Sequence, residues 1–319
     1  MPQSIKSATI TEMFPRVCIV GVGLLGGSFA AALRARGYRG HISGCGRRSM
    51  VDLVTKGLLD SEEESFANNQ ICNADLIYLA APIGNIIEFL DSKSQLIKPG
   101  AIVTDAGSTK REIVAAAEKI SNEATFVGGH PMAGSERTGA EYSDPQLFVG
   151  ATYVLTYSKR ANKDAISNLA QLVKFLDARP VLTDPETHDQ MVALISQVPQ
   201  LLATSLAAVA GSEPASESLF GLAGNGYRDM TRLAASKWSV WRDICRTNSD
   251  NMAVGLDKLI ASLSDLRSAL TNQDEKTISD SFDRANTAAE QLRQTKIKLF
   301  SPQDNFHHRV DTKSTENEN

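Results

Sequence analysis

The side chain of this protein best suited to moving a proton is His130. It stands in the run GGHPMAGSE (residues 128–136), where two glycines before it and a proline after it predict a loop. Only five histidines occur among the 319 residues. An imidazole can take up or release a proton near neutral pH, so His130 is a candidate general base. The competing interpretation is a loop histidine that is hydrogen-bonded for structure alone.

Two other segments bring polar side chains that could join His130. DAGSTK (105–110) follows a predicted strand and contains Ser108. GNGYRDMTR (224–232) belongs to the second half of the chain and ends at Arg232. The first of these segments and the one around His130 both fall at predicted carboxyl ends of strands, where open α/β sheets bind ligands. This placement predicts one site for a small molecule.

A glycine-rich turn has the spacing of a dinucleotide-binding loop. The apolar run VCIV leads directly into GVGLLGGS, and a helical pattern follows. Gly21 allows the tight turn, Gly23 lets the backbone approach a pyrophosphate, and Gly26 lets the helix pack closely on the strand. Free N–H groups at the helix start bind phosphate oxygens, and Leu24 and Leu25 within the turn are further candidate cofactor-binding residues. The strand–turn–helix context therefore predicts a bound nicotinamide dinucleotide.

The end of the next apolar run distinguishes NAD from NADP. Domains selective for NAD place an acidic residue about 20 residues beyond the glycines, where it binds the ribose 2′-hydroxyl. Here Gly46 occupies that place, and Arg47 and Arg48 follow it. A carboxylate would repel a 2′-phosphate, whereas two guanidinium groups suit one. We predict NADP rather than NAD; the alternative is that the two arginines are a solvated helix entry.

The first half of the chain alternates short apolar runs with helical patterns, which predicts parallel strands joined by crossover helices. The expected strands are 17–20, 41–45, 75–80, 101–106, 125–129, 152–156 and 180–183. The expected helices are 28–36, 50–56, 85–91 and 110–120. The predicted fold class is α/β, with a doubly wound Rossmann-type parallel sheet over residues 1–183.

The second half of the chain shows helical patterns only, at residues 186–211, 237–270 and 274–300. Pro199 lies inside the first pattern and predicts a kink. A helix as apolar as this one often packs against a second subunit, so we expect residues 184–300 to be an all-helical dimerisation domain of a homodimer. The polar tail, residues 301–319, is predicted to be disordered.

Bulk composition argues against several classes of protein. With 33 basic and 37 acidic side chains the formal charge is −4, so we expect neither nucleic acid nor a membrane as partner. The four cysteines lack zinc-binding spacing, which predicts reduced thiols, no metal and a cytoplasmic enzyme. The uncharged stretch 17–33 could pass for a signal-peptide core, but its four glycines fit the strand–turn–helix interpretation.

Taken together, these motifs make the chain resemble the prephenate/arogenate dehydrogenase family of tyrosine biosynthesis. The matching motifs are GVGLLGGS, DAGSTK, GGHPMAGSE, HD at 188–189, RDMTRLA and WRDI. They occur in the family's order over about residues 15–300.

The resemblance implies NAD(P)-dependent oxidative decarboxylation of prephenate to 4-hydroxyphenylpyruvate. By this resemblance His130 takes the proton of the ring hydroxyl while hydride leaves for the nicotinamide. Ser108 resembles the serine that orients the histidine and touches the nicotinamide. Arg232 resembles the arginine that binds a substrate carboxylate, a task that suits a bidentate guanidinium. Glu136 is expected to pair with an arginine at the mouth of the site, although a surface salt bridge explains it nearly as well.

One segment departs from the family's pattern. The family commonly has Ser-His-Leu-Pro-His on the long helix, and this chain has Ser196-Gln197-Val198-Pro199-Gln200. Ser196 and Gln200 are four residues apart, so they share a helix face and are candidate substrate-binding residues. Gln200 can form hydrogen bonds but cannot carry charge. This change leaves open whether tyrosine inhibits the enzyme. It also leaves open arogenate, which would give tyrosine directly, or a 4-amino analogue as the substrate.

Two more distant alternatives share the dinucleotide domain. A β-hydroxyacid-type dehydrogenase has a similar layout but would carry a catalytic lysine in its helical half, and no such motif is recognisable here. A redox-sensing module would bind the cofactor without turnover. The presence of His130, Ser108 and Arg232 together argues against the second alternative.

Overall fold

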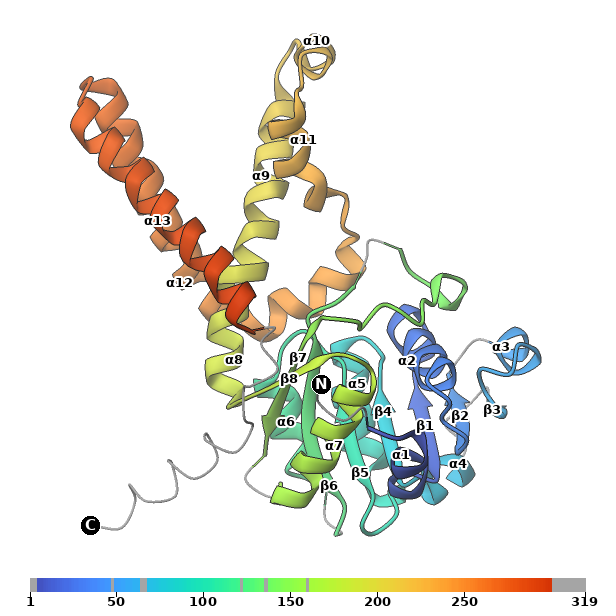
Figure 1. Ribbon diagram of the computed structural model, residues 1–319. Helices are drawn as coiled ribbons and strands as arrows, with labels where there is room; N and C mark the ends of the chain where they lie inside the picture. Colours follow the sequence, from blue (N-terminus) through green and yellow to red (C-terminus); the bar gives the residue numbers. More distant parts are fainter. Residues whose placement is uncertain are drawn as a thin grey trace, which may run out of the picture. The chain divides into compact units, whose positions relative to one another are not determined.

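The computed structural model describes residues 5–46, 49–63, 68–120, 123–134, 137–158 and 161–299 (Figure 1). The chain divides into two compact units. Residues 5–252 form the first unit, and residues 253–299 belong to the second. All the described residues of the candidate site lie in the first unit.

The centre of the first unit is an eight-stranded sheet with the strand order β3-β2-β1-β4-β5-β6-β7-β8. Neighbouring strands run parallel except for β6 and β7, which are antiparallel. This order confirms the predicted doubly wound sheet, to which the structure adds one antiparallel pair. The strands are β1 (Arg16–Val20), β2 (His41–Cys45), β3 (Ser61–Glu63), β4 (Leu76–Leu79), β5 (Ile102–Asp105), β6 (Thr125–Pro131), β7 (Thr152–Tyr157) and β8 (Arg179–Thr183).

Three of the four helices predicted between the strands begin within two residues of their predicted positions, and α4 and α7 were not predicted. Helix α2 starts at Leu24, whereas the predicted helix started at residue 28. That prediction was wrong because packing outweighs the low helix propensity of Gly26 and Gly27. The helices up to β8 are α1 (Ser7–Met13), α2 (Leu24–Ala35), α3 (Val51–Thr55), α4 (Asn68–Asn73), α5 (Ile83–Lys93), α6 (Arg111–Ala117) and α7 (Lys163–Phe175), with 3₁₀ turns η1 (Ser94–Leu96) and η2 (Ala140–Tyr142).

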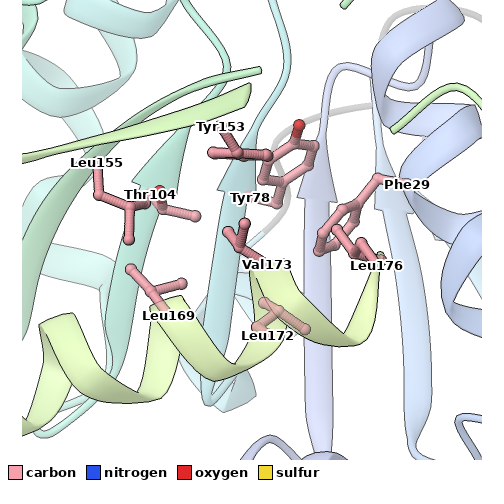
Figure 2. Close-up of a pocket in the computed structure, with 9 residues that line it drawn as sticks. All are labelled: Phe29, Tyr78, Thr104, Tyr153, Leu155, Leu169, Leu172, Val173 and Leu176. Atoms are coloured by element: carbon pink, nitrogen blue, oxygen red, sulfur yellow. The ribbon is translucent and has the colours of Figure 1, made fainter. Parts of the chain in front are cut away.

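Alternate side chains of the strands face opposite layers of helices, as expected for strands buried on both faces. Ile77 and Val103 belong to a core cluster with residues of α4, α5 and α6. Tyr78, on the other face of β4, stacks on Phe29 of α2 with ring centroids 4.0 Å apart. Figure 2 shows this second face, where α2 and α7 meet the sheet around a cavity of about 10 Å³. The cavity has room for about one water molecule, so it is a gap in the core and no substrate site.

Two features of the sheet differ from the predictions. Strand β3 was not predicted, because its sequence SEE is short and polar, as edge strands often are. His130 was predicted to lie in a loop, but it lies inside β6 and is paired with Val154 of β7. The strand continues past the glycines because the antiparallel partner β7 supplies hydrogen bonds as far as Pro131.

The long helix expected at residues 186–211 is broken into three pieces. These are α8 (Pro185–Val192), a π-helical turn η3 (Ala193–Gln197) and α9 (Val198–Ser212). The irregular turn ends two residues before Pro199, whose missing N–H cannot continue the hydrogen-bond ladder. The predicted interruption is therefore present, and it takes the form of a π-helical turn.

Two short helices, α10 (Ser216–Gly221) and α11 (Asn225–Thr231), pack against α9 (Figure 1). A short turn, η4 (Arg232–Ala235), follows α11 and also packs on α9. Large apolar side chains of this part are exposed: Met191, Leu194, Ile195, Val209, Leu219, Phe220, Leu222, Met230, Trp238 and Val240. Among the described residues, the stretch Pro185–Ser212 has the length and composition of a membrane span, a test that the core helix of a soluble protein also passes.

The last two helices are α12 (Trp238–Thr271) and α13 (Glu275–Leu299). Asn248 interrupts α12 with non-helical backbone angles, φ −141° and ψ 22°. The residues of α12 up to Met252 belong to the first unit, and the rest of α12 and α13 belong to the second. Asp274 caps α13 by accepting a hydrogen bond from the Thr277 N–H at 3.1 Å.

Candidate active site

The glycine turn between β1 and α2 has the shape that a pyrophosphate requires. Gly21 has φ +91°, and a Cβ atom there would lie 2.8 Å from the Ala81 backbone nitrogen. A Cβ on Gly26 would collide with the carbonyl oxygen of Gly21. Gly23 instead faces open space, with no atom within 4 Å of where its Cβ would be. The turn is therefore closed where protein packs on it and open where the cofactor phosphates would approach, so these residues fit a dinucleotide.

The segment after β6 folds back over the start of α2. Ser28 accepts a hydrogen bond from the Asp144 N–H at 2.9 Å. A Cβ on Gly27 would collide with the Ser143 hydroxyl, so glycine allows this close approach without a shift of Ser143. The glycine turn is thereby tied to the chain that leads away from His130.

The end of β2 bears on the choice between NAD and NADP. Gly46 has open space around it, with only Met50 within 4 Å of where a Cβ would lie. The predicted 2′-phosphate ligands, Arg47 and Arg48, lie outside the described residues. The structure also brings an acidic residue to this loop, because the Glu62 carboxylate on β3 accepts a hydrogen bond from the Met50 N–H. Sequence analysis missed Glu62 together with its strand.

His130 is buried and makes a side-chain contact that its position in the chain does not suggest. Its Nδ1 atom lies 2.9 Å from Nε2 of His188, which comes from α8. The two rings meet edge to face, with centroids 5.1 Å apart and an interplanar angle of 72°. Desolvation by burial, then His188 and the Lys110 ammonium, hold the pKa of His130 well below 6.5. His130 is therefore neutral at physiological pH.

The next residue, Asp189, completes a chain of hydrogen bonds behind His130. His188 Nδ1 lies 2.7 Å from the Asp189 carboxylate, which is fully buried. The same carboxylate accepts the backbone N–H groups of Lys110 at 2.7 Å and Arg111 at 3.0 Å. These amides open α6, so Asp189 caps a helix other than its own. The HD motif thus joins α8 to the loop that carries Ser108.

A buried ion pair fixes the two strand ends beside His130. The Lys110 ammonium contacts the Asp105 carboxylate and also donates to the Gly129 carbonyl oxygen at 2.8 Å. Asp105 in turn accepts the backbone N–H groups of Gly107 at 2.8 Å and Gly129 at 2.9 Å. Burial lowers the pKa of Lys110, and the charge of Asp105 opposes that shift. The pair therefore locks the end of β5 to β6, one residue before His130.

The other predicted site residues are dispersed over the first unit. Ser108 is half-buried, at the same edge of the sheet as the glycine turn, and its hydroxyl bonds to no other described residue. Arg232 is exposed at the start of η4, and its guanidinium forms no ion pair within the described chain. Ser196 is half-buried in the π-helical turn. Glu136 lies outside the described residues.

The two glutamines that replace the family's histidines are both buried and engaged. Gln200 donates to the Leu233 carbonyl oxygen at 2.8 Å and accepts from the Ser236 hydroxyl at 3.2 Å. It therefore ties α9 to the turn that begins with Arg232. Gln197 accepts from the Asn248 side-chain amide at 2.8 Å, which also donates to the Asp189 carbonyl oxygen at 2.8 Å. The break in α12 lets Asn248 join η3 to α8.

Comparison with family models identifies both halves of the chain. A model described as the nucleotide-binding domain of prephenate dehydrogenase matches residues 29–182. A model described as the prephenate dehydrogenase dimerization domain matches residues 184–284. Together these matches cover most of the chain.

Individual relatives agree with these matches. The chain is 31% identical over 277 residues to a prephenate dehydrogenase of Bacillus subtilis (strain 168), covering 84% of this chain and 74% of that protein. It resembles the crystal structure of prephenate dehydrogenase from A. aeolicus in complex with hydroxyphenyl propionate and NAD+, with 28% identity, a TM-score of 0.80 and coverage of 92% and 100%. It also resembles Synechocystis arogenate dehydrogenase, with 27% identity, a TM-score of 0.76 and coverage of 87% and 99%.

Proposed function

The chain belongs to the prephenate dehydrogenase family, and from that premise we propose that it converts prephenate to 4-hydroxyphenylpyruvate and carbon dioxide in tyrosine biosynthesis. It is an oxidoreductase with a nicotinamide-dinucleotide-binding domain. The observation that carries the proposed chemistry is the state of His130. The ring is buried and neutral, and Nδ1 is occupied by His188, which leaves Nε2 as the atom available to a substrate.

The reaction needs one proton acceptor and one hydride acceptor. We assign the first role to His130. Its Nε2 atom accepts the proton of the substrate's ring hydroxyl as the carbon that bears this hydroxyl becomes a carbonyl. A nicotinamide dinucleotide held at the glycine turn would supply the hydride acceptor for the same carbon. The bond to the ring carboxylate then breaks, its electron pair enters the ring as carbon dioxide leaves, and the oxygen recovers a proton as the phenol forms. The gain of aromaticity makes the sequence of steps strongly downhill.

Residues around His130 supply binding and orientation in this proposal. The backbone N–H groups of Leu24 and Leu25, at the open side of Gly23, hold the cofactor phosphates. Ser108 orients the histidine at the nicotinamide end. Arg232 binds a substrate carboxylate, since an exposed guanidinium with no ion pair among the described residues is free to form a bidentate contact.

Three remaining candidates act around the substrate. Gln200 holds the turn of Arg232 in place and so contributes to binding indirectly. Ser196 is assigned to the substrate side of the π-helical turn. Glu136 is assigned to the mouth of the site, where it would pair with an arginine.

We further propose that the cofactor is NADP rather than NAD. The space around Gly46 and the adjacent Arg47 and Arg48 in the sequence support this choice, because two guanidinium groups suit a 2′-phosphate. The test is the ratio of kcat/KM for NADP over NAD. Replacing both arginines by serine should lower that ratio at least about tenfold, the effect of roughly 1.4 kcal/mol. An unchanged ratio would mean that Arg47 and Arg48 are solvated and do not bind the 2′-phosphate.

Assembly and location complete the proposal. We divide the chain into a dinucleotide-binding domain (1–183) and a helical domain (184–300) that pairs with a second copy in a homodimer. The exposed apolar side chains between Met191 and Val240 support this assembly, because so many on one region mark a protein interface. The description of the matching domain as a dimerization domain supports it as well. We place the enzyme in the cytoplasm, where its free cysteines would stay reduced.

The substrate assignment has a direct test. The purified protein is mixed with prephenate or arogenate and with NAD or NADP, and formation of the reduced cofactor is followed by absorbance. We expect the largest kcat/KM with prephenate and NADP. Faster turnover of arogenate would favour the second candidate, which the likeness to Synechocystis arogenate dehydrogenase supports. Silence in all four mixtures would refute both.

A further inference from the structure

We propose that His188 and Asp189 are positioning residues that set the tautomer of His130, so that its Nε2 atom is unprotonated and can accept the substrate proton. The proposal depends on the proposed function only for which molecule supplies that proton. It concerns three side chains that lie within hydrogen-bond distance of one another along a buried line.

The direction of the hydrogen bonds follows from Asp189. Its carboxylate faces donors: the backbone N–H of Lys110, the backbone N–H of Arg111, and the Arg111 guanidinium 3.5 Å away. An ionised carboxylate can only accept hydrogen bonds. His188 must therefore present a protonated Nδ1 to Asp189, across the distance of 2.7 Å.

The same logic carries over to the next ring. In this proposal His188 carries a single ring proton, on Nδ1, so its Nε2 is unprotonated and is an acceptor. His130 lies 2.9 Å away and must donate from its own Nδ1. Because His130 is neutral, its Nε2 then carries the free electron pair. The opposite tautomer would place a proton on Nε2 and prevent catalysis by this histidine.

The pair also acts when His130 becomes positive. Burial, then a protonated His188 and the Lys110 ammonium, disfavour an imidazolium at this position. The hydrogen bond to His188 becomes charge-assisted at that moment, and the negative charge of Asp189 lies directly behind it. The arrangement parallels the role of the aspartate in a Ser-His-Asp triad, which orients its histidine and stabilises the positive form.

Three elements hold the line of side chains rigid. The carboxylate of Asp189 is fastened to the start of α6, and its carbonyl oxygen accepts from Asn248 of α12 at 2.8 Å. Both His188 and Asp189 lie on α8, which packs on α6. Because these contacts leave His188 little freedom, its Nε2 stays in reach of His130.

The test uses variants of His188 that differ only in which neighbour they can reach. In His188→Asn the amide is too short to meet His130, although it can still bond to Asp189. In His188→Gln the amide reaches the place of Nε2, and its oxygen can accept from His130. We expect His188→Asn to lower kcat by about tenfold to hundredfold with KM changed less than about threefold, and His188→Gln to recover much of that loss. His41→Asn is the matched control, because His41 bonds to Ser61 on β3 and has no part in the site.

A spectroscopic readout separates positioning from a purely structural role. ¹⁵N-labelled histidine in the full-length protein reports, at neutral pH, which nitrogen of His130 carries the proton. We expect protonated Nδ1 and bare Nε2 in the unmodified enzyme and in His188→Gln, and a mixture of tautomers in His188→Asn. A protonated Nε2 in the unmodified enzyme, or normal kcat in His188→Asn, would overturn the proposal. Since the spectra need no substrate, they decide it even if prephenate and arogenate are both inert.

Discussion

Lys110 and Asp105 form an ion pair in which both side chains are 0% exposed. Taking two charges out of water is costly, and removing one partner leaves the other charge buried and unpaired. Lys110→Met should therefore lower the free energy of unfolding by about 3–5 kcal/mol. Urea denaturation followed by circular dichroism measures this change. The effect should appear as a lower midpoint with an unaltered slope.

The matched control is Lys98→Met, which breaks the ion pair between Lys98 and Asp75. Those side chains are 41% and 22% exposed, so solvent screens the pair. We expect a loss below about 1 kcal/mol. Equal losses in the two variants would show that burial of the Lys110 pair has no special weight.

Removing the proposed proton acceptor should affect chemistry more than binding. His130→Asn keeps a polar side chain but cannot take the hydroxyl proton, so kcat should fall by a factor of about 10²–10⁴. Dinucleotide affinity, measured by calorimetry, should change less than about threefold, because the glycine turn is untouched. A kcat within a factor of two or so of normal would remove His130 from the mechanism.

The low pKa of His130 has a consequence for stability at acid pH. The folded protein keeps this histidine neutral as the pH falls through 6.5, whereas the unfolded chain binds a proton there. The unfolded state then holds more protons, so the free energy of unfolding must decrease below that pH. His130→Asn removes this contribution, and its stability should decline less steeply below pH 6.5. Parallel curves for both proteins would contradict the assignment.

The glycine turn allows two alanine variants with opposite signatures. Gly23→Ala places a methyl group into open space, so stability should change by less than about 1 kcal/mol while dinucleotide affinity drops at least about tenfold. Gly21→Ala strains a residue with φ +91° and pushes its Cβ against Ala81, so stability itself should fall by about 1–3 kcal/mol. Thermal unfolding and calorimetric titration separate the two effects. If Gly23→Ala binds the dinucleotide as tightly as the unmodified protein does, the pyrophosphate does not bind at Gly23.

Arg232 tests how the substrate is held. Arg232→Gln keeps hydrogen-bonding capacity but loses the charge and the bidentate geometry. We expect KM for the substrate to rise at least about tenfold with a smaller change in kcat, since the contact is made before and during the reaction. Steady-state kinetics with the preferred substrate measures both. Arg228→Gln is the control, because Arg228 lies on neighbouring α11 and donates to the Ala223 carbonyl oxygen.

Features that depend on local spacing were predicted from the chain alone. The strand–turn–helix around Gly21, seven of the eight strands and the helical second half follow from patterns a few residues long. A glycine at a φ of +91° and short continuous runs of apolar residues leave such patterns whatever the rest of the chain does. Strand β3 was missed because it pairs through its backbone at the sheet edge and carries no apolar run.

The site around His130 was only half visible in the sequence. The motif pointed to His130 itself, because glycine and proline beside a rare histidine are a local signal. The sequence could not show that Nε2 of His188, 58 residues later, lies 2.9 Å from Nδ1 of His130. That contact exists because α8 packs on α6, and Asp189 satisfies backbone amides that α6 leaves open.

The sequence by itself predicted that a dinucleotide binds at a glycine turn and that a histidine acts near it. Only the tertiary structure decided that Nδ1 of that histidine contacts His188. The residue type specifies which chemistry a side chain can perform. An imidazole has two nitrogens, however, and its hydrogen-bond partners determine which of them carries the proton. Those neighbours come from α6 and α8, which are far apart in the chain and meet only when the core is packed.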